Sequence, residues 1–128
     1  MSNLPDSLAL CIQTKPRITR EDNGMSTVEA TFSFPDTFPG FDGHFPGNPI
    51  VPGIAQIMAA VYTATMGDAS RLKEVKRCKF LHPIKPCEKV KVTVTTTKKQ
   101  TSVLCDAKLD ANGAPCADIT FFVETRVA

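Results

Sequence analysis

One stretch of the chain concentrates the residue types that acid–base chemistry uses. It covers residues 41–53, FDGHFPGNPIVPG, and holds one of the two histidines of the chain, His44. Its three prolines each fix φ and remove a backbone donor, and its three glycines allow conformations closed to other residues. The pattern predicts a shaped, ordered loop. A histidine held in such a loop is a candidate general acid or base, and the bland alternative is a structural histidine.

The residues that follow the loop predict the element that positions it. Residues 54–66 contain no glycine, proline or charge, and their apolar members recur at helical spacing. Pro52 suits the first turn of a helix, where its missing N–H would be unpaired anyway. Gly53 then presents a bare N–H at the positive end of the helix dipole. Such a position can hold a carbonyl oxygen that gains negative charge.

Two motifs resemble a known family. Residues 43–53, GHFPGNPIVPG, closely resemble the GHFPGxPxxPG signature of the hotdog-fold 3-hydroxyacyl-(acyl carrier protein) dehydratases of fatty acid synthesis. Residues 80–86, FLHPIKP, resemble the family's second signature, Phe-x-x-Pro-x-x-Pro, which is usually followed by glycine and here by Cys87. The resemblance implies that His44 is catalytic and that the Gly53 N–H binds the thioester carbonyl.

One position departs from the family. Its members carry Glu or Asp on the helix fourteen residues after the histidine, and that position here is Met58. Dehydration needs a base for the proton beside the thioester carbonyl, a donor for the enolate-like oxygen, and an acid for the leaving hydroxyl. Methionine has no proton to give, but it is a flexible apolar filler that suits a pocket for acyl chains.

Four explanations of this departure stay open. His44 performs both proton transfers, or another group assists. The auxiliary candidates are Asp42, which can orient His44, Gln56, which can only hydrogen-bond, and the more remote Asp36 and His82. Alternatively, the chain is a helper subunit paired with a homologue that supplies the carboxylate. Finally, the pocket serves another thioester reaction, such as hydrolysis, or binds acyl chains without catalysis.

The pocket walls can be predicted less sharply. We expect Pro52, Ile54 and Met58 to line the substrate pocket. Phe45 either anchors the loop against the helix, which we favour, or joins that lining.

The pattern of elements predicts an α+β domain over residues 1–128. Alternating apolar residues or apolar runs predict strands near residues 8–13, 27–34, 71–82, 89–97, 101–109 and 116–127. Within the third of these, Leu72, Val75 and Phe80 are expected to point inward. The helix is expected from Ile54 to about Gly67. The resemblance selects the hotdog fold, a curved antiparallel sheet wrapped around one long central helix.

Composition excludes several other classes. Net charge is +2, hydrophobic residues make up 42% of the chain, and no apolar stretch reaches membrane-spanning length, so neither nucleic acid nor a membrane is expected as a partner. The five cysteines have no metal-ligand spacing and are expected to be reduced thiols of a cytoplasmic protein. We expect no metal and no cofactor.

We therefore interpret the chain as a (3R)-hydroxyacyl-(acyl-carrier-protein) dehydratase-like protein of fatty acid or related lipid, polyene or polyketide synthesis. The alternatives are a helper subunit that binds acyl thioesters and an acyl thioesterase. The resemblance implies a substrate on the phosphopantetheine of acyl carrier protein, or an acyl-CoA thioester. It also implies a homodimer, with a higher oligomer or a heterodimer with a carboxylate-bearing homologue as variants.

Overall fold

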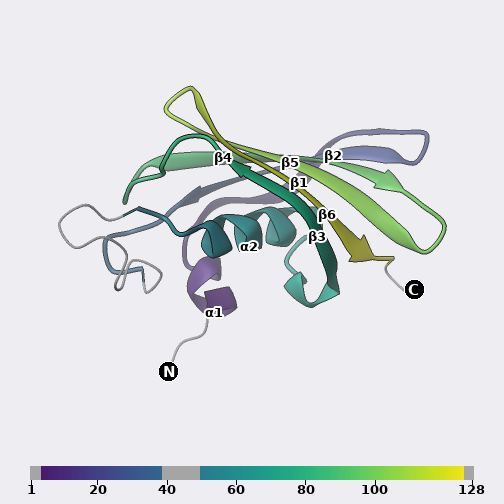
Figure 1. Ribbon diagram of the computed structural model, residues 1–128, viewed down its shortest axis with the longest axis horizontal. Helices are drawn as coiled ribbons and strands as arrows, with labels where there is room; N and C mark the ends of the chain where they lie inside the picture. Colours follow the sequence, from purple (N-terminus) through teal and green to yellow (C-terminus); the bar gives the residue numbers. More distant parts are fainter. Residues whose placement is uncertain (1–3, 39–49, 126–128) are drawn as a thin grey trace.

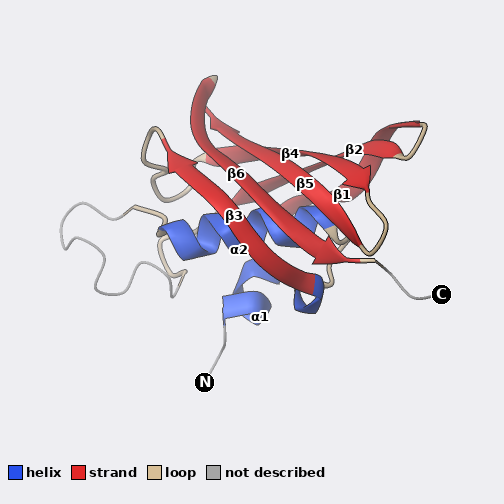
Figure 2. Cartoon of the chain, turned by 45° about the vertical axis from the view of Figure 1, so that its right-hand side comes forward, coloured by secondary structure: helices blue, strands red, loops and turns tan. Residues whose placement is uncertain are grey.

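The computed structural model describes residues 4–38 and 50–125 of the chain. Within them, one six-stranded antiparallel sheet curves over a central helix, α2 (Gly53–Ala64), as Figures 1 and 2 show. The strand order is β1-β2-β4-β5-β6-β3. The strands are β1 (Ile12–Asp22), β2 (Met25–Ser33), β3 (Leu72–Phe80), β4 (Lys89–Lys98), β5 (Ser102–Ala111) and β6 (Ala114–Glu124). The predicted α+β hotdog arrangement is confirmed.

Strict alternation of side chains builds the face of the sheet that covers α2. On β2 and β4, buried residues stand directly opposite one another in the ladder, which is how an antiparallel pair stabilises one face. These pairs are Val28↔Val94, Ala30↔Val92 and Phe32↔Val90. On β5 and β6 the corresponding buried pairs are Cys105↔Phe121 and Ala107↔Ile119. The period of two in the sequence therefore predicted the core of the sheet correctly.

Small side chains let α2 lie close to this sheet. Ala55, Ala59 and Ala60 are fully buried, whereas Ile54 is 57% exposed and Met58 is only partly buried. Of the larger residues at helical spacing, Ile57, Met58 and Tyr62 are only partly buried, whereas Val61 is fully buried. None of the helices in residues 4–38 and 50–125 is long and apolar enough to cross a membrane.

The helix ends in a left-handed turn. Met66 has φ +55° and Gly67 has φ +104°. The Gly67 N–H donates to the Tyr62 carbonyl at 2.9 Å, and the Met66 N–H donates to the Thr63 carbonyl at 3.4 Å. These two bonds form a Schellman motif, which satisfies carbonyls that the helix itself leaves free. The predicted stop at Gly67 is close to the observed one.

One expectation about the strands is wrong. Residues 8–13 do not form a strand of their own: a short helix, α1 (Leu4–Ala9), comes first, and β1 begins at Ile12. Leu8 is fully buried, so its hydrophobicity reflects packing in the core cluster rather than a strand. The predicted inward face of β3 is confirmed, because Leu72, Val75 and Phe80 stand opposite the buried Val123, Phe121 and Ala117 of β6. Val75 and Phe80 are nevertheless 37% and 47% exposed at this edge of the sheet.

Neighbouring phenylalanines on β6 provide a test of the fold. Phe121 is fully buried, whereas Phe122 is only partly buried and lies under the Lys76 ammonium at 5.9 Å from its ring centre. We expect Phe121→Ala to lower the free energy of unfolding by about 3–5 kcal/mol, because it opens a cavity in the core. Phe122→Ala should cost about 1 kcal/mol, mostly from lost partial burial and the cation–π contact. Equal losses of stability in urea unfolding would contradict the assigned register.

Candidate functional site

The start of α2 leaves backbone donors without partners. Pro52 is the N-cap, with extended backbone (φ −67°, ψ 155°) and no side-chain cap, rather than the first-turn residue that the sequence predicted. The N–H groups of Ala55 and Gln56 both donate to the Pro52 carbonyl, at 3.0 and 3.2 Å. Among the described residues, the N–H groups of Gly53 and Ile54 have no acceptor, and the first turn holds no acidic residue. This end of the helix can therefore stabilise a partly negative oxygen.

A cleft of about 360 Å³ opens beside these donors. One wall is the segment that enters α2, and the other is the turn that leaves β3. The Val51 N–H donates to the Ile84 carbonyl at 2.7 Å, and this bond joins the two walls. The described lining consists of Ile50, Val51, Pro52, Gly53 and Gln56 on one side and Phe80, Leu81, His82 and Pro83 on the other.

The ring of Phe80 stands directly over Gly53. A Cβ atom at position 53 would lie 2.9 Å from Cζ of Phe80, closer than real Cβ contacts. An aromatic ring therefore approaches the backbone of residue 53 closely. This ring lies beside the uncapped helix start and forms part of the apolar wall of the cleft.

Gln56 brings the one buried amide side chain to this cleft. It is 4% exposed, and its Nε2 donates to the Val51 carbonyl at 3.2 Å. Because a carbonyl can only accept, this bond requires the nitrogen of the amide to face Val51. Oε1 of Gln56 is buried and has no hydrogen-bond partner among the described residues.

His82 also lies on the cleft wall, although the sequence analysis counted it among the more remote candidates. It is exposed, and its N–H lies 3.4 Å from the Cys116 carbonyl, while the Leu81 N–H donates to the same carbonyl at 2.8 Å. The sequence identified residues 80–86 only by their resemblance to the family's second signature. Nothing in their local pattern shows that the turn folds back against the start of a helix some 30 residues earlier.

Only some of the other predicted site residues fall within the described part of the chain. His44, Asp42 and Phe45 fall outside the described residues. Ile54 is exposed, Met58 packs against the core, and neither is among the described lining of the cleft, whereas Pro52 is. Within residues 4–38 and 50–125, no three His, Cys, Asp or Glu side chains are grouped in a way that could hold a metal ion.

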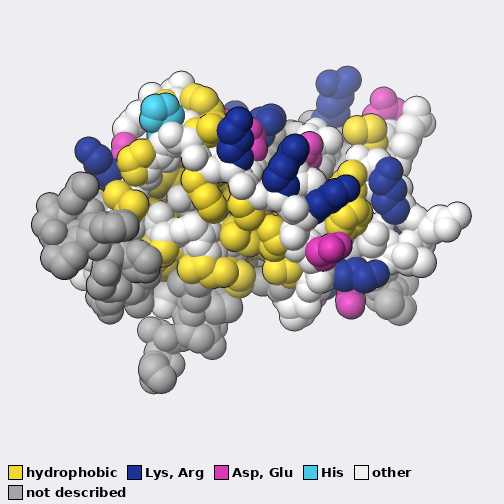
Figure 3. Space-filling model, in the orientation of Figure 1, with side chains coloured by type: hydrophobic (Ala, Val, Ile, Leu, Met, Phe, Trp, Pro, Cys, Tyr) yellow, Lys and Arg dark blue, Asp and Glu magenta, His cyan; other side chains and the backbone are white. Residues whose placement is uncertain are grey.

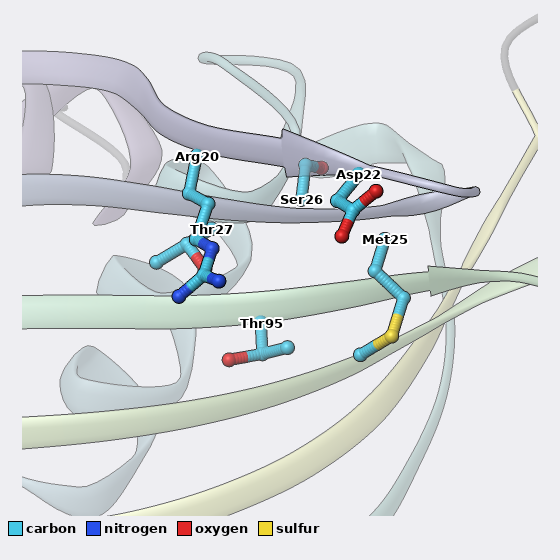
Figure 4. Close-up of a pocket in the computed structure, with 6 residues that line it drawn as sticks. All are labelled: Arg20, Asp22, Met25, Ser26, Thr27 and Thr95. Atoms are coloured by element: carbon cyan, nitrogen blue, oxygen red, sulfur yellow. The ribbon is translucent and has the colours of Figure 1, made fainter.

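A second hollow, of about 250 Å³, lies on the β1–β2 hairpin (Figure 4). In Figure 1 this hairpin and the start of α2 are at opposite ends of the molecule. The hollow is lined by Arg20, Asp22, Met25, Ser26, Thr27 and Thr95, which come from β1, β2 and β4. It shares no residue with the cleft.

The five cysteines are free, as expected, and four of them are poor nucleophiles. Burial raises the pKa of the Cys11 thiol to about 11 and that of Cys105 to about 12, although the charge of Arg71 acts slightly in the opposite direction on Cys105. Burial also raises the pKa of Cys78 and Cys116. Cys87 is exposed and takes φ +67°, which explains why the resembling family usually has glycine after its second signature.

Comparison with protein families identifies relatives of this arrangement. The model of the ApeI-like family, described as ApeI dehydratase, matches residues 19–117. The chain is 32% identical over 95 residues to the 3-hydroxyacyl-(acyl-carrier-protein) dehydratase FabZ of Lactobacillus helveticus, covering 65% of this chain and 64% of the relative. It is 32% identical over 102 residues to FabZ of Allorhizobium ampelinum, covering 70% of this chain and 66% of the relative. The matches therefore span less than two thirds of these curated relatives.

Solved structures share the fold. The dehydratase heterocomplex ApeI:P from Xenorhabdus doucetiae superimposes with a TM-score of 0.66 at 20% identity, covering 87% of this chain and all of that one. A hypothetical thioesterase protein with coenzyme A from Streptococcus pneumoniae gives 0.60 at 12% identity, covering 98% and 97%. At these identities the likeness concerns the fold alone.

The contact between Gly53 and Phe80 predicts the effect of adding one methyl group. In Gly53→Ala, the new Cβ should push the half-exposed Phe80 ring aside, since the ring is the movable partner. Stability should change by less than about 1 kcal/mol, because alanine is a better helix former than glycine. Aromatic proton resonances of Phe80 should shift strongly.

Gly113→Ala is the matched control. Position 113 has φ +75° and no neighbour within 4 Å of an added Cβ, so alanine there meets backbone strain without a clash. It should cost about 1–2 kcal/mol and leave the Phe80 resonances in place. Unmoved Phe80 resonances in Gly53→Ala would contradict the close approach.

Burial of Cys105 predicts a pH dependence of stability. Its pKa rises from 9.0 to about 12 on folding, so between these values the folded protein keeps a proton that the unfolded chain releases. Stability should therefore fall as pH rises above about 9, by up to about 1 kcal/mol per pH unit for this thiol. Urea unfolding between pH 8 and 10 should show a shallower fall for Cys105→Ala. The exposed-thiol control Cys87→Ala should follow the wild type, and identical slopes for all three proteins would contradict the assignment.

Proposed function

The chain belongs to the ApeI-like dehydratase family, and from that premise we propose that it dehydrates 3-hydroxyacyl thioesters held on an acyl carrier protein. The observation that carries the proposal is the cleft at the start of α2. There the Gly53 N–H, which has no acceptor among the described residues, opens a helix with no side-chain cap and no acidic residue in its first turn. A thioester carbonyl placed on this N–H would gain stabilisation as negative charge builds on its oxygen.

We assign the base to His44 on the strength of the GHFPG motif. In this assignment the imidazole takes the proton from the carbon beside the thioester carbonyl. The electron pair of that C–H bond forms the double bond, the C–O bond at the third carbon breaks, and the departing oxygen takes a proton and leaves as water. Because Met58 stands where the family has an acid, we assign the second proton transfer to His44 as well.

His82 is the other imidazole of the chain and lies on the cleft wall. If His44 does not protonate the departing oxygen, His82 is therefore the first other group to examine. The reaction as proposed needs no metal and no cofactor beyond the phosphopantetheine arm that carries the substrate.

A helper subunit is the second candidate, and Met58 is the observation that favours it. The solved ApeI:P structure is described as a dehydratase heterocomplex, so two unlike subunits occur in a relative with the same fold. In this reading a partner with a carboxylate on its helix would complete the site. The thioesterase reading rests only on the name of a neighbour with the same fold.

The surface near the cleft is compatible with a dimer. In the chain alone β3 pairs on one side only, and Val75, Phe80 and Leu81 are exposed on and just beyond it. Figure 3 shows hydrophobic side chains gathered along this view of the molecule, with Lys and Arg side chains above and beside them. We propose a homodimer joined along the β3 edge, with basic groups available to an acidic carrier protein. A cytoplasmic location stays a prediction from the free thiols.

Hydration of a trans-2-enoyl thioester, the reverse reaction, tests the proposal. The purified protein should add water to crotonyl-pantetheine or to crotonyl acyl carrier protein, which can be followed by loss of the enoyl thioester absorbance. His44→Ala should lower the rate at least about 100-fold, the usual share of a general acid–base group. Release of free thiol instead would identify a thioesterase.

If the folded wild-type protein shows no activity in this assay, the chain is not an enzyme that works alone. Met58→Glu then separates the remaining readings, since the position is only partly buried and can accept a carboxylate. Activity gained in Met58→Glu would identify a dehydratase scaffold that lacks only its acid. A carboxylate-bearing homologue that co-purifies and restores activity would identify a helper subunit.

A further inference from the structure

Gln56 carries a polar atom for which the described fold supplies no partner. Its Oε1 is buried and unpaired, while the other end of the same amide is held by the Val51 carbonyl. A buried acceptor without a hydrogen bond costs about 1–3 kcal/mol, so such atoms are rare in folded proteins. The unpaired Oε1 therefore points to a partner outside the described residues, which a bound ligand can supply.

The cleft is where that partner has to come from. Gln56 lines it, and the residues around it in the described lining are mostly apolar: Ile50, Val51, Pro52 and Phe80. An amide oxygen only accepts hydrogen bonds, so the missing partner is an N–H or O–H group of a ligand. A saturated acyl chain has neither.

We propose that Oε1 of Gln56 accepts a hydrogen bond from the 3-hydroxyl of the acyl chain and thereby selects 3-hydroxyacyl thioesters over unhydroxylated ones. The inference rests on the proposed function, because it takes the thioester carbonyl to lie on the Gly53 N–H. Gln56 follows Gly53 by one helical turn on the same side, a rise of about 4.5 Å. The 3-hydroxyl lies two carbons beyond the carbonyl, which matches this spacing.

The burial of Gln56 indicates which part of the substrate reaches it, the acyl chain or the pantetheine arm. Gln56 is 4% exposed, whereas Leu81, on the other wall, is 40% exposed. The pantetheine arm has to run out to its carrier and therefore leaves along the exposed side. The group that reaches the buried Gln56 is on the acyl side of the carbonyl, where the hydroxyl is.

This role differs from acid catalysis. A neutral amide gives up no proton, but a hydrogen bond from the hydroxyl to Oε1 fixes the direction of the C–O bond and leaves the oxygen lone pairs free for an acid. Gln56 is thus a substrate-binding and orienting residue. Its removal should act on the affinity for hydroxylated ligands rather than on acyl ligands in general.

The test compares two ligands that differ only in the hydroxyl. The probes are the (3R)-3-hydroxybutyryl and butyryl amides of pantetheine, in which nitrogen replaces the thioester sulfur so that neither is turned over. By calorimetry the wild type should bind the hydroxylated probe about tenfold more tightly, as expected for one buried hydrogen bond. Gln56→Met, similar in length but without an acceptor, should lose this preference. Gln100→Met, the same change at an exposed turn, should keep it.

A preference that survives in Gln56→Met, or an equal loss of affinity for both probes, would overturn the inference, since a purely structural role through Val51 affects both ligands alike. A wild type without preference, or without binding, would overturn it too. The crotonyl hydration assay reports separately on the proposed function. If Gln56→Met does not fold, the side-chain carbonyl carbon resonance of Gln56 in the wild type decides: it should shift with the hydroxylated probe only, and equal shifts with both probes would reject the proposal.

Discussion

The cleft depends on one hydrogen bond, from the Val51 N–H to the Ile84 carbonyl at 2.7 Å. Val51 is 2% exposed and Ile84 is fully buried, so the bond is shielded from competing water. It joins the segment that enters α2 to the turn that leaves β3. With the two segments held together in this way, the Phe80 ring lies over Gly53, and Gln56 and His82 line one cavity. The local geometry of the site therefore follows from a contact between distant parts of the chain.

The start of α2 shows how the fold tolerates an incomplete helix cap. Pro52 offers no side-chain acceptor, and the first turn has no carboxylate. The free N–H groups therefore make this end of the helix less stable than a capped one. The Gln56 amide compensates in part, because its Nε2 donates to the Val51 carbonyl and so ties the segment that enters α2 to the helix. Unsatisfied groups at both ends of this short stretch, two N–H donors and one Oε1 acceptor, are what a ligand with a carbonyl and a hydroxyl would complete.

The sequence predicted those parts of the structure that local periodicity determines. Buried Val90, Val92 and Val94 alternate with polar residues, and this register needs no knowledge of distant contacts. The helix was predicted because its glycine–proline loop and its uncharged run are both local signals. The inward face of β3 was predicted too, but the partial exposure of Val75 and Phe80 was not, since the same residue types serve a central strand and an edge strand, and only the strand order distinguishes the two. The place of His82 and the orientation of the Gln56 amide depend on the Val51–Ile84 contact, which no local pattern encodes.

The absence of a carboxylate at position 58 changes what the rest of the site has to do. A buried carboxylate beside an acyl chain would be costly to desolvate, whereas Met58 adds only apolar surface. If one imidazole takes the proton from the second carbon and returns it to the oxygen on the third, both atoms have to face the same side of the imidazole. A freely rotating hydroxyl would often face away. An acceptor on the adjacent helical turn, such as Oε1 of Gln56, restricts that rotation without introducing charge, so an orienting amide and a missing acid are consistent features of one site.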